Sequence, residues 1–174
     1  CGRKHGLWEQ YHENGQLEIR GEFENNQPSV FFEQYFENGQ LHGKGNYKNS
    51  KNDGLWIWYY ENGQLRFKGS YKDGLPDGVV EQYFENGQLK SKGNHKNGKQ
   101  YGLDVSYNKN GHLSLRINYK DGDWDGLFES FHDNGNLRAK GNYKNGKNEG
   151  LWERYDEDGN FVETINYKAG KKIE

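Results

Sequence analysis

The sequence predicts an all-β protein, an elongated single-layer antiparallel meander of about seven β-hairpins that twists and curves along its length. Three observations lead to this prediction: a 24-residue repeat along the whole chain, an Asn-Gly pair in almost every repeat, and short segments that alternate aromatic and polar residues. Alternating segments favour strands, and Asn-Gly between two of them favours a hairpin turn. Both connections within a repeat are too short for the crossover that parallel strands require.

The repeat is clearest in the glycines. When the repeats are aligned, the glycines fall in columns of equivalent positions. One column runs from Gly15 to Gly159 in steps of 24 residues, and three further columns keep the same period. The four columns hold 23 of the 25 glycines, so the period is not a coincidence. We therefore predict one repeat array over residues 1–174, either complete or cut from a longer chain. Its repeats are 6–29, 30–53, 54–77, 78–101, 102–125, 126–149 and 150–173.

Each repeat is predicted to hold two strands. In the first repeat they cover Leu7–His12 and Gln16–Glu24, where apolar and polar residues alternate. Asn14-Gly15 should join them in a type I′ turn, which needs positive φ at both residues, and Asp158-Gly159 takes that place in the last repeat. A wider loop should join consecutive repeats, as in Lys144–Gly150, where the glycines again suit positive φ.

One connection between repeats departs from this pattern. Val30 stands where the other repeats have glycine, and Pro28 lies in the preceding loop. Proline fixes φ near −65°, and a β-branched residue disfavours positive φ. We therefore expect the backbone of this connection to differ from that of the other five.

Composition indicates a folded protein with a thin, aromatic core. Only 30% of the residues are hydrophobic, yet 16% are aromatic, and large rings can supply burial where aliphatic residues are scarce. The formal net charge of −2 gives no basic excess for nucleic acid. No apolar run is long enough to cross a membrane. A single cysteine excludes an internal disulfide framework.

Three segments carry a family resemblance. GLWEQYHENGQL, GNYKNGKNEGLWERYDEDG and GSYKDGLPDG resemble MORN repeats, in the bacterial variant whose hairpins contain Tyr-x-x-Asn-Gly, and the resemblance covers essentially the whole chain. It implies an elongated scaffold that binds proteins and, in some members, lipids; one bacterial subgroup carries an antitoxin label. The family brings no catalytic residues and no cofactor, so we expect a protein without enzymatic activity.

The candidate binding site lies where the middle repeats break the pattern. Trp58 occupies a column that otherwise holds Gln, Ser or Arg, and alternation places it on the same sheet face as Trp56 and Tyr60. One hypothesis is an exposed aromatic patch that binds a partner. The alternative is that this face is the core and its rings are buried. The patch comprises Phe32, Phe36, Trp56, Trp58, Tyr60 and Phe84.

Several partners remain open. The first hypothesis is a scaffold that binds another protein along its sheet, and the second is a carbohydrate- or cell-envelope-binding module that stacks sugars on exposed rings. Polar groups beside an exposed Trp would favour sugars, and a smooth aromatic groove would favour a protein. A lysine row could instead meet anionic lipid head groups, although glutamates lie close by. That row is Lys48, Lys72, Lys96, Lys120, Lys144 and Lys168.

Neither a metal site nor a cofactor is predicted. The six histidines scatter over different columns, and His12 and His132 share a column but lie five repeats apart. Cys1 has two interpretations. A mature bacterial lipoprotein begins with an acylated cysteine, which would place the chain at the cell envelope or surface. Alternatively, Cys1 aligns with Asn145 of a repeat loop, as in a chain cut from a longer array, and the protein is then cytoplasmic.

Overall fold

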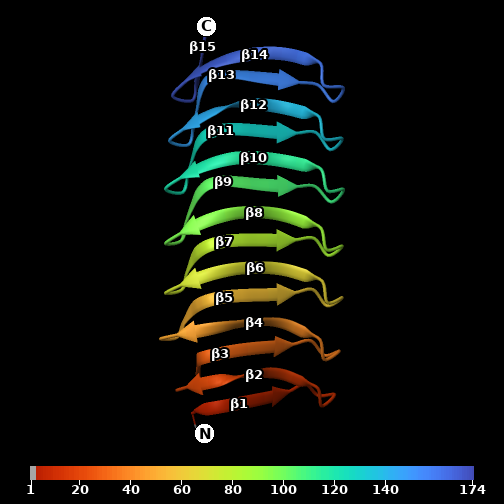
Figure 1. Cartoon of the computed structure of the whole chain (residues 1–174), viewed down its shortest axis with the longest axis vertical. Coiled ribbons are helices and arrows are strands. Elements are labelled where there is room, and N and C mark those ends of the chain that lie inside the picture. Colours follow the sequence, from red (N-terminus) through yellow and green to blue (C-terminus); the bar gives the residue numbers. More distant parts are fainter. Residues whose placement is uncertain (1–2) are drawn as a thin grey trace. The chain divides into compact units, whose positions relative to one another are not determined.

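The computed structural model describes residues 3–174, which form strands and turns and no helix. They divide into two compact units, an N-terminal unit that ends at Gly87 and a C-terminal unit that begins at Gln88. Within each unit every strand pairs antiparallel with the next strand along the chain, and Figure 1 shows this succession. The predicted all-β, single-layer antiparallel meander is confirmed.

The strands follow the 24-residue period. In the N-terminal unit they are β1 (Gly6–Tyr11), β2 (Leu17–Glu24), β3 (Gln27–Tyr35), β4 (Leu41–Lys48), β5 (Lys51–Tyr59), β6 (Leu65–Lys72) and β7 (Leu75–Tyr83). In the C-terminal unit they are β8 (Leu89–Lys96), β9 (Lys99–Tyr107), β10 (Leu113–Lys120), β11 (Asp123–Phe131), β12 (Leu137–Lys144), β13 (Lys147–Tyr155), β14 (Phe161–Lys168) and β15 (Lys171–Ile173).

The predicted turn type at Asn14-Gly15 is wrong. Only Gly15 has positive φ, at 82°, and Asn14 does not. The Gly15 amide donates to the His12 carbonyl at 2.9 Å, and the strand register shifts at Gln10 and Tyr11. This is a turn followed by a left-handed glycine and a bulge, which the longer hairpin loops favour. The equivalent turns of the other repeats repeat the positive φ at glycine alone.

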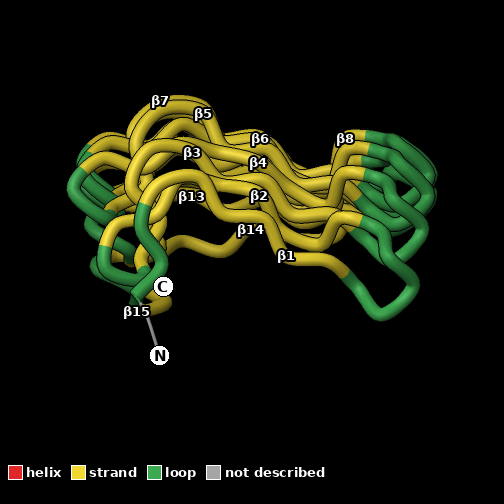
Figure 2. The backbone as a smooth tube through the Cα atoms, turned by 90° about the horizontal axis from the view of Figure 1, so that it is seen from below, coloured by secondary structure: helices red, strands yellow, loops and turns green. Residues whose placement is uncertain are grey.

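The two-residue turns lie instead between repeats. Asn145 and Gly146 both have positive φ, at 51° and 73°, as a type I′ turn requires. The expected wide loop Lys144–Gly150 is therefore wrong, because β13 already begins at Lys147 and pairs with β12. Figure 2 shows the two kinds of turn, in green, at opposite ends of the yellow strands.

The departure expected near Val30 is confirmed at that residue only. Val30 lacks the positive φ that its glycine equivalents adopt, such as 81° at Gly54. The turn before it, at Asn25 and Asn26, nevertheless has positive φ at both residues like the other inter-repeat turns. Asparagine tolerates the left-handed region well enough to replace glycine there, so the difference is confined to the strand that follows the turn.

The core is centred on a row of side chains on one face. In the N-terminal unit the row alternates large residues, of which Trp8 at the end is exposed, with glycine on successive strands, and in the C-terminal unit Ile117 and Ile165 take two of the glycine places. Trp56 pairs with Gly69, and Trp152 pairs with Ile165. Trp56 is only 3% exposed. A Cβ atom placed on Gly45 would overlap the indole of Trp56, so the ring lies on the backbone of the neighbouring strand. This core row is Trp8, Gly21, Phe32, Gly45, Trp56, Gly69 and Val80 in the N-terminal unit, and Gly93, Asp104, Ile117, Phe128, Gly141, Trp152 and Ile165 in the C-terminal unit.

Asp104 is the exception in the core row, because it places a carboxyl group where other repeats have a ring or valine. It pairs with Ile117, which is fully buried, and its carboxylate covers Gly93. Gln100 Nε2 donates to Asp104 Oδ2 at 3.1 Å. Burial raises the pKa of the Asp104 carboxyl, and the Gln100 hydrogen bond and the charge of His95 oppose that rise.

Asparagine side chains tie consecutive turns together. Asn62 Oδ1 accepts from the Gln64 amide at 2.9 Å and closes its own turn, while Asn62 Nδ2 donates to the Glu85 carbonyl of the next turn, also at 2.9 Å. Asn14, Asn38 and Asn134 make the same two bonds one repeat apart. The carboxamide group is needed because it both accepts and donates. We call these bonds the asparagine ladder.

The asparagine ladder can be tested at Asn62. Asn62→Asp keeps the oxygen that closes its turn but removes the donor to the Glu85 carbonyl, so we expect the unfolding free energy to fall by about 0.5–1.5 kcal/mol in urea denaturation. Asn38→Asp is the matched control, because its Nδ2 lies 3.4 Å from the Glu61 carbonyl and its bond is weaker. Equal losses at both positions would mean that the added charge, and not the lost donor, is responsible.

Asp104 should make stability depend on pH. Because its pKa in the folded state is raised, its favourable contribution exists only at low pH and is lost as pH rises through the folded pKa. Asp104→Asn should therefore increase the unfolding free energy at pH 7, by about 1 kcal/mol, and the gain should vanish below about pH 4. Asp121→Asn, in an exposed turn, is the control and should change little. A gain at Asp104 that is the same at both pH values would contradict this account.

Candidate functional site

Four of the six predicted patch residues come together in the N-terminal unit. Trp56 and Trp58 stack with ring centroids 6.0 Å apart, and Phe32 stacks on Trp56 at 6.4 Å. Phe36 joins them through His42, whose ring lies 4.3 Å from Phe36 and 5.1 Å from Trp58. Tyr47 meets Phe32 and Trp56 edge-on. We call this group the aromatic cluster: Phe32, Phe36, His42, Tyr47, Trp56 and Trp58.

Burial within the aromatic cluster is graded. Trp56 is buried in the core row, whereas Phe32, Phe36 and Trp58 are partly buried. The buried Trp56 therefore packs against one side of the Trp58 ring. The accessible parts of the cluster belong to the rings around Trp56, on a face that no other described element of the N-terminal unit covers.

Gly43 determines how Trp58 lies. The two residues pair across β4 and β5, and a Cβ atom on Gly43 would overlap the six-membered ring of Trp58. The equivalents of Gly43 in other repeats include Ile19, Phe67 and Leu115. Gly43 also lies outside the four glycine columns, so the one tryptophan in its column faces the one glycine in the neighbouring column. The indole can thus lie flat on the sheet with its outer side toward solvent.

His42 extends the predicted patch. Burial lowers the pKa of its imidazole, and the nearby positive charge of Arg66 lowers it further. The ring therefore favours its neutral form between Phe36 and Trp58 and acts as a further aromatic contact. Sequence reasoning missed His42 because its column holds charged residues in neighbouring repeats, such as Glu18 and Arg66.

Tyr60 has a different role from the one its aromatic ring suggests. Its hydroxyl donates to the Tyr83 carbonyl at 2.8 Å, and the Arg66 guanidinium lies 5.8 Å from its ring. His12 and His132, in the same column, contact the equivalent carbonyls of the following repeats at 3.0 Å. This column therefore connects repeats. Phe84 continues the column one repeat beyond Tyr60 and is partly buried.

A hollow of about 270 Å³ lies beside Ile57, and its lining includes the charged residues Glu33 and Lys44. Ile57, the other residue that breaks the repeat beside Trp58, lines it together with Phe31 and Leu55. Ile57 and Trp58 therefore serve different faces, as alternation along a strand requires.

A second group of rings in the C-terminal unit was not predicted. Trp124 lies 4.8 Å from Tyr143, and both connect through Phe128 to Trp152 and Tyr167. Trp124 is partly buried and stands in a column that holds Lys4, Asn52 and Gln100 elsewhere. Comparison of the columns would have found it, since it breaks its column as Trp58 does. Beside these rings a hollow of about 390 Å³ is lined by Phe128, Trp152 and Arg154 among others.

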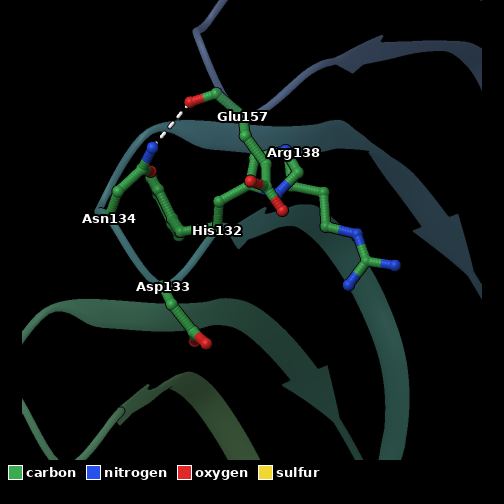
Figure 3. A pocket seen from close by; sticks show the side chains of 6 residues that line it. His132, Asp133, Asn134, Arg138 and Glu157 are labelled. Atoms are coloured by element: carbon green, nitrogen blue, oxygen red, sulfur yellow. Dashed lines mark hydrogen bonds between the residues drawn. The ribbon is translucent and has the colours of Figure 1, made fainter.

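A more polar hollow of about 430 Å³ lies at the Asn134 turn, where His132, Arg138 and Glu157 gather (Figure 3). Its polar groups already hold the turns together. Asn134 Nδ2 donates to the Glu157 carbonyl at 2.6 Å, and His132 Nε2 contacts the Tyr155 carbonyl at 3.0 Å. The hollow is therefore best explained as the surface of the asparagine ladder.

Residues 3–174 contain no group of three or more His, Cys, Asp or Glu side chains placed to hold a metal ion. In the same range, no helix is long and apolar enough to cross a membrane. The interpretations of Cys1 as a lipidation site or as part of a repeat loop lie outside the described residues.

Comparison with known families agrees with the repeat seen in the structure. A family model described as the MORN repeat variant matches six segments that together cover well over half of the chain: residues 4–25, 32–49, 52–73, 76–97, 124–145 and 148–169. The unmatched stretch between the fourth and fifth segments includes Asp104. Comparison with curated proteins gave no match. On the family match and the hairpin repeat together, the chain belongs to the MORN repeat variant family.

Proposed function

We propose that this chain is a non-catalytic scaffold that binds another protein through the aromatic cluster. MORN repeats are generally associated with protein or membrane binding, and the family is typically non-catalytic. The observation that carries the proposal is Trp58, a partly buried ring on an uncovered sheet face, in a column that otherwise holds polar side chains. Tryptophan and tyrosine are enriched among the residues that contribute most to binding at interfaces.

The geometry of the cluster suits a protein contact. Trp56 and Gly43 fix the ring of Trp58 before any partner arrives, so little side-chain entropy remains to be lost on binding. Partly buried rings around it provide an apolar centre, and the exposed Arg66, whose charge acts on His42, provides part of a polar rim. An apolar centre with a polar rim is typical of protein interfaces.

A carbohydrate ligand is the second candidate. Gln34 pairs with Gly43, and Gln82 pairs with Phe67. A side-chain amide therefore lies two strands away from Trp58 in each direction across the sheet. A flat indole with amides nearby could stack on the apolar face of a sugar and hydrogen-bond to its hydroxyl groups. The amide groups beside the partly buried Trp58 are the observation that supports a sugar ligand.

Trp58→Gln restores the residue most common in that column and tests the site. We expect it to weaken partner binding by about 2 kcal/mol or more. Unfolding free energy should fall by only about 1 kcal/mol, because the ring is partly buried. Partners captured by the wild type would be identified by mass spectrometry, purified and titrated by calorimetry, and a glycan array would test the second candidate.

Trp124→Gln is the matched control, since it removes another partly buried tryptophan from a column in which no other repeat has an aromatic ring. It should cost similar stability and leave binding unchanged. If both variants bind as the wild type does, the aromatic cluster is not the site. If Trp58→Gln loses several kcal/mol of stability while binding is intact, the ring belongs to the core.

A further inference from the structure

The two ends of the strands carry opposite charges. In the N-terminal unit, each turn that contains Asn-Gly presents one exposed glutamate, and none of these carboxylates forms an ion pair with a described residue. The asparagine ladder holds these turns at one fixed spacing, with the Asn62 bond to the Glu85 backbone as an example. We call this row the Glu edge: Glu13, Glu37, Glu61 and Glu85.

Three inter-repeat turns of the C-terminal unit present a lysine on each side, and at the fourth, Asp121–Gly122, Lys120 pairs with Asp123. Lys96 pairs with Lys99, and Lys144 pairs with Lys147, directly across their turns. Like charges directly opposite each other are unfavourable in a sheet, and none of these ammonium groups has an ion pair with a described residue. We call this row the Lys edge: Lys96, Lys99, Lys144, Lys147, Lys168 and Lys171.

The stems of Lys99 and Lys147 lie against the next turn. An added Cβ on Gly122 would lie 3.8 Å from the Lys99 Cβ, and one on Gly170 would lie 3.5 Å from the Lys147 Cβ. Glycine at these two turn positions leaves room for the stem, so the side chains of Lys99 and Lys147 begin beside the following turn.

Charged side chains in the middle of the strands differ from those at the strand ends in forming ion pairs. Cross-strand ion pairs neutralise them, as in Arg116–Glu129 at 2.8 Å and Lys140–Glu153 at 2.9 Å. Several mid-strand charges thus find partners within the sheet, while those of the Glu edge and the Lys edge have no ion-pair partner among the described residues.

We propose that the Lys edge of one copy of this chain binds the Glu edge of a second copy. The carboxylates of the Glu edge recur every two strands, or about 10 Å. The lysine pairs of the Lys edge follow the same 24-residue period but skip the Asp121–Gly122 turn, where Lys120 pairs with Asp123. A second copy can therefore place lysine pairs opposite three of the four carboxylates of the Glu edge. Each lysine pair can receive one carboxylate, which removes the repulsion within the pair.

The contact joins two different surfaces, so it is heterologous and does not close a dimer by itself. We therefore expect association to continue as concentration rises. Exposed ion pairs are screened by salt, and the Debye length falls from about 20 Å at ~20 mM salt to about 4 Å at ~500 mM. In sedimentation velocity, the wild type should form species larger than the monomer at the lower salt concentration and be at least about tenfold weaker in association at the higher one.

Charge reversals identify the surfaces. One variant reverses the Lys edge with Lys96→Glu, Lys99→Glu, Lys144→Glu and Lys147→Glu, and another reverses the Glu edge with Glu13→Lys, Glu37→Lys, Glu61→Lys and Glu85→Lys. Each alone should remain monomeric at low salt, and a mixture of the two should associate, since each contributes one unaltered edge. Thermal melting would check that both variants are folded.

The chain with all eight reversals is the decisive control, because it keeps the formal net charge of −2 of the wild type. It should regain salt-sensitive self-association, which a general effect of net charge would not produce. A wild type that stays monomeric at low salt at every concentration would overturn the proposal. So would association that survives high salt or either single-edge reversal, or wild-type monomers that bind anionic vesicles through the Lys edge without associating.

Discussion

A sheet with no second layer must bury its aromatic side chains against its own backbone, and the rest of this structure depends on that constraint. Rings can lie down on a neighbouring strand only where that strand has no side chain in the way. Gly45 provides the space for Trp56, and Gly141 provides it for Trp152. The core is consequently one ring thick. This explains how a chain with 30% hydrophobic residues folds, because each large ring is covered partly by backbone and partly by the rings of adjacent repeats.

The same constraint made much of the fold predictable. A glycine that faces a ring in most repeats appears in the sequence as a column, and this column together with the turn glycines reveals the period, the strands and the antiparallel order. The types of turn were harder to predict from the sequence. Asn14-Gly15 and Asn145-Gly146 carry the same dipeptide, but only the second has positive φ at both residues. The number of residues between the last paired positions decides which turn forms, and that number depends on strand register, which the dipeptide does not contain.

The candidate site was predictable only as far as single columns allow. Trp58 stands out because its column is polar, but the role of Gly43 depends on which strands are neighbours and in which register. His42 and Tyr60 show that the residue types in a column do not determine which contacts a side chain makes. His42 contacts the rings although its column holds mostly charged residues. Tyr60 lies in a column that is aromatic in the middle repeats, but its hydroxyl donates a hydrogen bond to the Tyr83 carbonyl. Trp124 could have been predicted from the sequence alone, by applying the same comparison of columns to every position.

A repeat sheet offers two kinds of surface, and they select partners in different ways. A residue type that fits one repeat recurs in the others, so a single glutamate in a turn becomes the Glu edge, and the asparagine ladder prevents its charges from moving apart. A weak contact repeated at fixed spacing adds up only with a partner of the same spacing. A break such as Trp58 with Gly43 occurs once, so its partner must match a local shape and no period. The rows therefore suit association with like chains, while the breaks suit recognition of an unlike partner, and one sheet can carry both because the turns and the faces are separate surfaces.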